Sequence, residues 1–290
     1  TGLFVASIPF TSMLYGITKG KYDFRVRQIP LTLSNLPKAF DGFRIAQISD
    51  IHSGSFDDIE AIRHGVALIN QQKPDIILFT GDLVNFDERE IEPFIGEFKK
   101  LNSKIGVYSV LGNHDYGDYK KWEREEEQLE NRDLLRQYHK EMNFNLLMNE
   151  NVILEKEGDR ISIIGVENWG KLPFPQNGDI DKALAGAEEV PFKILMSHDP
   201  YHWSQKVISH STHFDLTLAG HTHGMQFGVD IPGFKWSPAE YVYPQWAGLY
   251  EESGQLLYVN RGFGFIGFPG RVGIAPEITV FELRSGKDAY

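Results

Sequence analysis

Short apolar runs alternate with helical patterns along most of the chain. Runs of strand length occur at 43–48, 76–79 and 107–111. Between the first two, apolar side chains in 59–69 recur at helical spacing, and 91–101 shows the same pattern before the third. This alternation of strands and helices predicts an α/β layered fold with a parallel component.

Beyond the third strand, residues 117–142 interrupt this rhythm with many charges and only a partial apolar stripe. They predict one or two surface helices inserted in the domain, which we interpret either as a solvated helical face or as a cap over a substrate. Strand-like runs then return at 152–154, 161–166, 192–196, 216–218, 256–259 and 278–281. Because no internal repeat or linker divides the pattern, residues 31–290 are predicted to form one domain.

The first 30 residues have a different character. Residues 1–17 carry no charge, and four cations with a single acid follow them: Lys19, Lys21, Arg25 and Arg27 with Asp23. A run this short does not cross a bilayer alone, since crossing takes roughly 20 apolar residues. We interpret 1–30 either as the end of a membrane anchor with its basic flank or as an apolar helix on the domain or at an interface. In the first case the positive-inside rule predicts a membrane-associated protein with a cytoplasmic domain.

The composition of the chain limits the kinds of partner and site that it can have. The net charge of the 290 residues is -11, which argues against a broad electrostatic footprint for nucleic acid. The absence of cysteine excludes disulfides, thiolate zinc sites and cysteine nucleophiles. An acidic protein also repels phosphate at long range, so a phosphate site here needs local positive charge, which bound divalent metals supply.

Five of the apolar strands end in clusters of polar side chains. These clusters are Ser49-Asp50-Ile51-His52, Thr80-Gly81-Asp82, Gly112-Asn113-His114-Asp115, Ser197-His198-Asp199 and Gly220-His221-Thr222-His223-Gly224. Functional sites in open α/β sheets lie at the carboxyl ends of strands, so we expect these side chains to converge. Each cluster alone is also compatible with an ordinary turn or helix cap.

The spacing within the clusters suits metal binding. Asp50 and His52 are two residues apart, as are His221 and His223, so each pair points the same way on an extended segment. Carboxylate, imidazole and amide oxygen ligands together suit divalent Mn, Fe, Zn or Co.

In order and spacing, the five clusters resemble the signature of the calcineurin-like metallophosphoesterase superfamily, over residues 43 to about 285. The segments 220–226 and 260–264 resemble its YkuE/YaeI-like, membrane-associated bacterial branch. The superfamily resemblance implies a four-layer α/β/β/α sandwich with mixed sheets, built around two divalent metal ions.

The resemblance also implies a role for each polar side chain. The first metal would be held by Asp50, His52 and His223, the second by Asn113, His198 and His221, and Asp82 would bridge them. The nucleophile would be a bridging hydroxide. His114 would stabilise the transition state or protonate the leaving group, and Asp115 would orient His114.

These roles imply an enzyme that hydrolyses a phosphodiester, phosphomonoester or pyrophosphate bond. The branch resemblance adds a lipid or UDP-sugar-lipid substrate and contact with a membrane. One alternative is a metal-dependent nuclease or cyclic-nucleotide phosphodiesterase, but the acidic charge counts against nucleic acid. Another is a non-catalytic binding protein of the same fold, although no ligand of the signature is missing here. The sequence leaves the oligomeric state open.

Three features lie outside the signature. Arg261 borders a segment rich in Gly and Phe, where it would either grip a phosphate or belong to a loop that packs on the sheet. The aromatic residues of 227–250 would line an apolar pocket, meet a membrane interface or pack in the core. We expect His202, although near His198, to lie at the surface.

Overall fold

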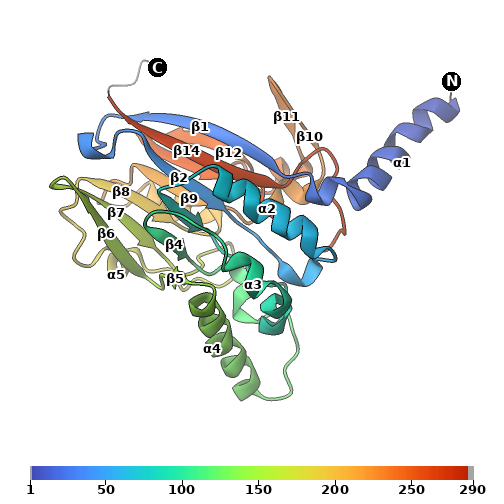
Figure 1. Cartoon of the computed structure of the whole chain (residues 1–290), viewed down its shortest axis with the longest axis horizontal. Coiled ribbons are helices and arrows are strands. Elements are labelled where there is room, and N and C mark those ends of the chain that lie inside the picture. The colour runs from blue at the N-terminus through green and yellow to red at the C-terminus, as the bar shows by residue number, and fades with distance from the viewer. Residues whose placement is uncertain (1, 287–290) are drawn as a thin grey trace.

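Two mixed six-stranded sheets form the framework of the protein (Figure 1). The computed structural model describes residues 2–286, and the side chains of residue 7 and residues 9–286. In order of hydrogen-bonded neighbours, the first sheet contains β1 (Arg25–Leu33), β14 (Glu277–Ser285), β2 (Phe43–Ile48), β3 (Ile76–Phe79), β4 (Gly106–Ser109) and β5 (Phe144–Leu146). The second contains β12 (Gly248–Glu252), β13 (Gln255–Val259), β9 (Leu216–Ala219), β8 (Phe192–Met196), β7 (Asp159–Gly165) and β6 (Glu150–Lys156).

The central strands of each sheet run parallel. In the first sheet β2, β3, β4 and β5 are parallel, and β14 is antiparallel to β2. In the second sheet β7, β8, β9 and β13 are parallel, and antiparallel β6 and β12 form the edges. The carboxyl ends of the parallel strands therefore meet at one edge of each sheet.

Helices cover the outer faces of both sheets. On the first sheet lie α2 (Ile59–Gln71), α3 (Ile95–Phe98) and α4 (Glu125–Glu141), and on the second lie α5 (Ile180–Leu184) and α6 (Pro200–His202), which continues as a π-helical turn (Trp203–Val207). The 3-10 helices are Gly20–Tyr22, Lys38–Phe40, Ser53–Ser55, Glu88–Phe94, Asn113–Tyr116, His223–Gln226 and Pro238–Tyr241.

The alternation of side chains along the strands separates the layers. In β3, Ile77 and Phe79 pack toward the helices, whereas Ile76 and Leu78 pack toward the second sheet. A third apolar cluster joins the outer face of the second sheet to α5 and α6. The expected four-layer α/β/β/α sandwich with mixed sheets is thus confirmed.

The hydrophobic pattern located most strands but misjudged one helix. The nine strand-like runs all coincide with strands, to within about two residues at most ends. The amphipathic helix expected at 91–101 is instead the 3-10 helix Glu88–Phe94 followed by the single turn of α3. Pro93 explains the difference, because proline has no backbone N–H to continue an α-helical ladder.

The charged insert at 117–142 forms a loop and one helix, α4. Its Leu135 and Tyr138 are buried against the first sheet, while the charged residues of the helix face solvent. The helix is thus part of the layered framework.

Two elements project from the same side of the sandwich: α1 (Gly2–Thr18) and the hairpin of β10 (Val229–Ile231) and β11 (Phe234–Trp236) (Figure 1). Within residues 2–286, no helix has the length and apolar character needed to cross a membrane. The boundary predicted at residue 30 falls inside β1, whose residues pair with β14.

Helix α2, whose apolar face packs on the first sheet, begins with a side-chain cap. The Asp58 carboxylate accepts hydrogen bonds from the backbone N–H of Glu60 (2.9 Å) and Ala61 (3.1 Å). We expect Asp58→Ala to lower the free energy of unfolding by about 1 kcal/mol, because two N–H groups lose their partner. Chemical denaturation measures this change. Asp58→Asn, which keeps a cap acceptor, should lose far less, and equal losses would contradict the capping role.

Candidate metal centre

The polar clusters converge because parallel strands of both sheets end at one place. Asp50 and His52 follow β2, and Asp82 follows β3. Asn113 begins the 3-10 helix after β4. From the second sheet, His198 follows β8, while His221 and His223 follow β9. Loops from two separate sheets therefore build one buried centre.

Asp50, His52 and His223 form the first group of candidate ligands. All three side chains are buried, and one ligand atom from each lies within 4.8 Å of the others. The Nε2 atom of His223 is 3.2 Å from Oδ1 of Asp50. Both oxygens of Asp50 also accept a hydrogen bond from the backbone N–H of His221 (3.0 Å each), which fixes the carboxylate.

Asp82, His198 and His221 form the second group, on the same distance criterion. His198 donates from Nδ1 to the carbonyl oxygen of Thr80 (2.7 Å), so its Nε2 is turned toward Oδ2 of Asp82, 3.1 Å away. A hydrogen bond of this kind fixes the tautomer and orientation of a ligating imidazole. Asn113 joins the group through Oδ1, which lies 2.8 Å from Nδ1 of His221.

Asp82 lies between the two groups. Its Oδ1 accepts a hydrogen bond from the backbone N–H of His114 (2.8 Å). Its other oxygen, Oδ2, is 3.1 Å from Nε2 of His198 and 3.5 Å from Nε2 of His52. One carboxylate oxygen thus faces imidazoles of both groups, which is the position that a bridging ligand requires.

The donor set fits two divalent cations. The Nε2 atoms of His52, His198 and His223 are buried, and although each faces a carboxylate oxygen at 3.1 to 3.5 Å, none makes an aligned hydrogen bond among the described residues. Buried polar atoms are rarely left unpaired, and here several point at the same small region. Such a cluster of unpaired nitrogens beside two carboxylates is what a metal site looks like without its ions.

The electrostatics of the centre favour bound cations. Burial opposes ionisation of Asp82, yet the charges of His198 and His114 hold its pKa well below the ordinary value. Burial likewise disfavours a charged His198, but the carboxylates of Asp82 and Asp50 raise its pKa to about 10. For His52 burial prevails and lowers the pKa to about 3, so this ring is neutral and can offer a nitrogen lone pair to a metal ion. The centre therefore retains negative charge for a cation to balance.

The backbone is strained at the candidate ligands. A positive φ in the left-handed region occurs at five of them: Asp50 (51°), His52 (49°), Asp82 (60°), His221 (71°) and His223 (51°). Each such residue costs about 1 to 3 kcal/mol unless the surroundings impose the conformation. Strain concentrated at one cluster lowers the stability of the fold. It indicates that these conformations are kept because they direct the side chains toward the centre.

Two glycines let the ligand loops approach one another. A Cβ atom at Gly112 would lie 2.1 Å from Oδ1 of Asp82, and one at Gly220 would lie 2.2 Å from Oδ2 of Asp50. Both distances are far below van der Waals contact. Glycine is therefore required beside each of the two carboxylates.

The structure assigns Asp115 different contacts from those expected. Its carboxylate is buried and accepts backbone hydrogen bonds from Gly112 and Asp82 (2.9 Å each) and from Leu83 (2.8 Å). The group that orients His114 is instead the carbonyl oxygen of Asn85, 2.7 Å from His114 Nδ1. Asp115 thus joins the loops after β3 and β4 and positions Asp82.

His114 is half-buried at the edge of the centre. Its imidazole is 5.0 Å from that of His52, centroid to centroid, and stacks on the ring of Tyr119 at 4.4 Å. Because Nδ1 donates to Asn85, the neutral ring has its lone pair on Nε2, which is the nitrogen available for proton transfer.

Sequence reasoning missed two tyrosines at the centre. The hydroxyl of Tyr243 is 2.7 Å from Nε2 of His221, and the hydroxyl of Tyr119 accepts a hydrogen bond from Nδ2 of Asn113 (2.8 Å). Each tyrosine therefore orients one side chain of the second group. Tyr119 belongs to the charged insert and Tyr243 to the aromatic 227–250 segment, and neither stands next to a signature cluster.

Two further expectations require correction. Arg261 is buried, and its guanidinium is bound by Glu277 (2.6 Å) and Asp230 (3.0 Å), so it makes structural ion pairs rather than facing a substrate. His202 was expected at the surface but is buried, with its Nδ1 2.9 Å from Oγ of Ser197 and its ring stacked on Trp169.

The close approach at Gly220 generates a test of the centre. We expect Gly220→Ala to reduce bound metal, because the added Cβ displaces the Asp50 carboxylate from the first group. Elemental analysis of the purified variant measures this loss. Gly96→Ala is a matched control, since a Cβ there meets nothing within 4 Å. Full metal content in the Gly220 variant would contradict the claim that the loop at Gly220 holds Asp50 in a ligand position; the added Cβ would also meet Ser49 Oγ at 1.9 Å.

The Tyr243 hydroxyl provides a second test. We expect Tyr243→Phe to weaken metal binding roughly 10- to 100-fold, the usual cost of losing a partner that orients a ligating histidine. Competition with a chromogenic chelator measures the affinity. Tyr241→Phe is the control, because Tyr241 is 76% exposed. Equal affinities in the two variants would exclude the orienting role.

Comparison with known proteins agrees with this geometry. The model of the calcineurin-like phosphoesterase family matches residues 43–225. The Bacillus subtilis protein named uncharacterized metallophosphoesterase YkuE is 30% identical over 256 residues, covering 87% of this chain and 82% of the relative. Phosphodiesterase YaeI of Escherichia coli is 27% identical, covering 83% of this chain and 82% of that protein.

Other similar proteins are longer than this chain. A zebrafish (Danio rerio) protein named transmembrane protein with metallophosphoesterase domain is 27% identical over 97% of this chain, which spans 62% of that relative. Among solved structures, the Haemophilus influenzae NAD nucleotidase aligns with a TM-score of 0.49 and 14% identity, over 77% of this chain and 45% of that one. From the family match and the relative in Bacillus subtilis, the chain belongs to the calcineurin-like metallophosphoesterase family and is a phosphoester hydrolase.

Proposed function

We propose that this protein is a dinuclear metal-dependent phosphodiesterase that acts on a substrate with a large apolar group. The observation that carries the proposal is the pair of ligand groups sharing Asp82. Asp50, His52 and His223 would hold the first cation, and Asn113, His198 and His221 the second. When bound, two such cations lower the pKa of a water nucleophile and neutralise the phosphoryl oxygens.

His114 is the residue that we assign to proton transfer. It contacts the bridging Asp82 through its backbone N–H, and the Asn85 carbonyl holds its ring from the other side. This arrangement leaves Nε2 as the atom that takes up a proton and, once protonated, gives it to the leaving oxygen. Asp115 acts indirectly, since it holds the loop that carries Asp82.

The surroundings of the centre support an apolar substituent on the substrate. Phe86 and Tyr119 are 43% and 42% exposed, and both rings contact His114. A cavity of about 280 Å³ adjoins His221 through Tyr243, and its lining combines Tyr201, Val242, Tyr243 and Pro244 with the polar Lys171, Ser204, Gln205 and Gln245. The aromatic and aliphatic part of this lining suits an acyl chain better than a charged polymer.

A lipid-linked phosphodiester, such as a lipid or UDP-sugar-lipid, combines these requirements, and the name of the Escherichia coli relative supports a diester. Such a substrate implies a membrane-associated enzyme. The uncharged, apolar α1 and the name of the zebrafish relative support that location. The cations that follow α1 favour a catalytic domain on the cytoplasmic side.

The shared position of Asp82 can be tested through the metal content of the protein. Purified protein should contain close to two transition-metal ions per chain, and Asp82→Asn should lower the occupancy of both sites together, because one carboxylate serves both. Elemental analysis and metal titration measure the two occupancies. Asp75→Asn is the control, because the Asp75 carboxylate is remote from the centre and pairs with Lys104. This variant should keep both ions. A variant of Asp82 that loses a single ion would disprove the bridge.

His114→Ala should keep both metals but lower kcat by about 10²- to 10⁴-fold, the usual range for a lost general acid. Steady-state hydrolysis of an aryl phosphodiester, with metal content measured in parallel, tests this. His64→Ala serves as the control, since His64 is an exposed residue of α2. Unchanged turnover in the His114 variant would refute the assigned role.

A substrate panel tests the apolar preference. It compares an aryl phosphomonoester, an aryl phosphodiester, a cyclic nucleotide, a phospholipid and a UDP-acyl-sugar. We expect kcat/KM to be highest for a lipid-linked diester, and Phe86→Ala to lower that value while changing hydrolysis of the small aryl diester less. A preference for the cyclic nucleotide would overturn the lipid assignment.

A further inference from the structure

Helix α1 presents apolar side chains to solvent. It has no charged residue, and of its described side chains Phe10 is 70% exposed, Leu14 53% and Met13 46%. A helix that is apolar on all sides is normally buried in protein or lipid. In Figure 1 α1 extends away from the sandwich, and its carboxyl end lies against the body of the protein.

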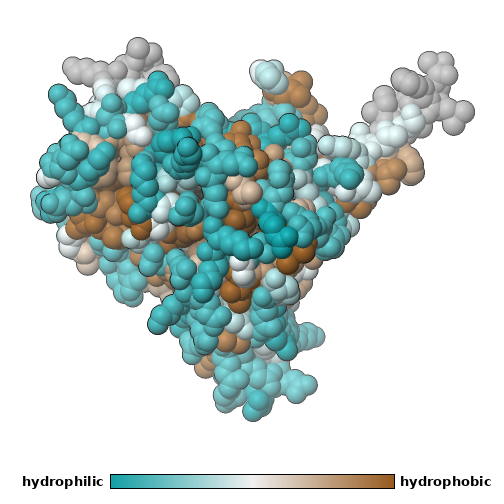
Figure 2. Space-filling model, in the orientation of Figure 1, coloured by the Kyte–Doolittle hydropathy of each residue, from teal (hydrophilic) through white to brown (hydrophobic). Residues whose placement is uncertain are grey.

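The β10–β11 hairpin has the same character. It belongs to neither of the two large sheets, and Ile231, Phe234 and Val229 are 58%, 56% and 37% exposed. Figure 2 shows hydrophobic surface on this hairpin and on the described part of α1, while most of the visible face is hydrophilic. Exposed apolar groups gathered on two projecting elements indicate an interaction surface.

One segment joins the two elements. Gly16 of α1 accepts a hydrogen bond through its carbonyl from the backbone N–H of Arg271 (3.1 Å). The next residue, Val272, pairs with Phe227 just before the hairpin. The helix and the hairpin are therefore fixed on either side of residues 271–273 and are presented together.

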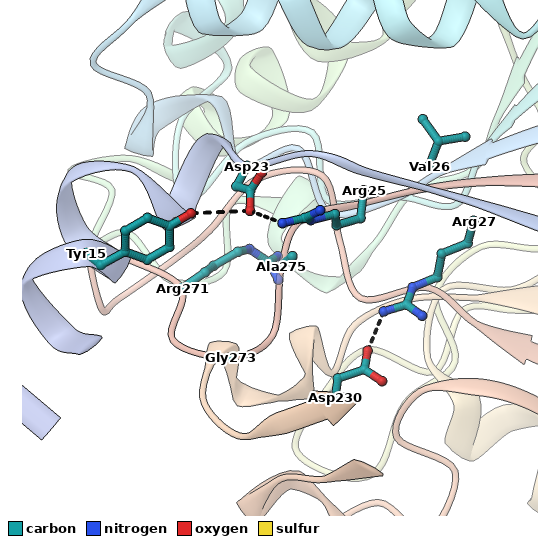
Figure 3. Close-up of a pocket in the computed structure, with 10 residues that line it drawn as sticks. Tyr15, Asp23, Arg25, Val26, Arg27, Asp230, Arg271, Gly273 and Ala275 are labelled. Atoms are coloured by element: carbon teal, nitrogen blue, oxygen red, sulfur yellow. Dashed lines mark hydrogen bonds and ion pairs between the residues drawn. The ribbon is translucent and has the colours of Figure 1, made fainter. Parts of the chain in front are cut away.

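A cavity of about 430 Å³ lies between them (Figure 3). Arg25 and Arg27 enter it from β1, where residues two positions apart share a face. Asp230 of the hairpin and Tyr15 of α1 complete the walls on either side. Figure 3 shows Arg25 directed toward Asp23 and Arg27 toward Asp230.

Cations outnumber anions around this cavity. Five ion pairs join three arginines to three acids: Arg25 pairs with Asp23, and Arg27 and Arg261, the latter behind the cavity, each pair with Asp230 and Glu277. The fourth arginine, Arg271, also lines the cavity but donates to the carbonyl oxygens of Arg261 and Gly264 and makes no ion pair with a carboxylate among the described residues. A positive excess stands out here, because the whole chain has a net charge of -11.

Of these arginines, Arg25 is the one that is available to a ligand. The side chain of Arg25 is 62% exposed, and an exposed ion pair such as that with Asp23 contributes little to stability. A phosphate can therefore replace Asp23 and receive two parallel N–H donors from the guanidinium. The apolar groups on both sides show what accompanies that phosphate, since free phosphate needs no hydrophobic surroundings.

We propose that this cavity binds the phosphate of an anionic phospholipid headgroup, while α1 and the β10–β11 hairpin insert into the adjoining acyl region of the bilayer. The proposal rests on the membrane location in the proposed function and names the surface responsible. The cavity adjoins the metal centre through Arg271 but is lined by none of the candidate metal ligands, so it would dock the enzyme on the membrane rather than bind the ester to be cleaved.

The test is co-sedimentation of the metal-loaded protein with vesicles of phosphatidylcholine, with and without phosphatidylglycerol. We expect tighter binding to the anionic vesicles. Arg25→Ala should reduce that binding about fivefold, the usual effect of one cation near an anionic surface, and leave binding to neutral vesicles unchanged. Ile231→Asp should weaken binding to both kinds of vesicle, because it removes an inserted apolar group.

The matched controls lie on α4, at the opposite end of the view in Figure 1. Arg136→Ala removes a cation that is 46% exposed, and Leu129→Asp alters an apolar residue that is 54% exposed. Neither should change vesicle binding. If all four variants bind like the unmodified protein, or if Arg136→Ala weakens binding as much as Arg25→Ala, the proposal is wrong.

A calorimetric titration separates a lipid headgroup from free phosphate. Short-chain phosphatidylglycerol should bind in an Arg25-dependent manner and far more tightly than inorganic phosphate. Equal Arg25-dependent binding of inorganic phosphate, without vesicle binding, would overturn the lipid assignment. Hydrolysis of a soluble aryl diester by the unmodified protein is measured separately. Vesicle binding without hydrolysis would refute the proposed function alone, and hydrolysis without vesicle binding would refute this inference alone.

Discussion

The burial of two carboxylates, Asp50 and Asp82, within one cluster of imidazoles is the constraint on which the site depends. Taking a carboxylate out of water is unfavourable unless hydrogen bonds and opposite charge compensate for the lost hydration. Backbone N–H groups of His221 and His114 supply part of that compensation. The Nε2 atoms that face the carboxylates without an aligned hydrogen bond could share the proposed cations with them, and those cations would supply the rest. Metal binding would then be linked to the stability of this region.

The fold meets this constraint by bringing strand ends from two sheets to one place. Parallel strands direct their carboxyl ends to a common edge, and the packing of the two sheets sets those edges beside each other. The ligand loops then accept left-handed backbone conformations, and Gly112 and Gly220 leave room for the carboxylates. Asp115 secures the arrangement, because its buried carboxylate holds together the loops after β3 and β4.

The surface features of the molecule are continuous with this buried centre. Arg271 lines the cavity at the base of α1, and its guanidinium is 3.1 Å from Nδ1 of the candidate ligand His223. The aromatic 227–250 segment likewise has two parts: its hairpin is exposed, whereas Tyr243 reaches His221. The same chain segments thus contribute to the metal centre and to the projecting apolar surface.

The sequence by itself determined the α/β class, most strands and the five clusters, because strand periodicity and the residues that follow each strand are local properties. Only the tertiary structure decided which groups pair. His221 donates its N–H to Asp50 across 171 positions of the chain, Tyr243 orients His221, and Arg261 is bound by Glu277 and Asp230 instead of facing a substrate. Such partners depend on how distant loops meet when the two sheets pack. Residue type and local spacing do not determine that packing. The positions of the clusters can therefore be predicted from the sequence, whereas the contacts of Asp115 and His202 cannot.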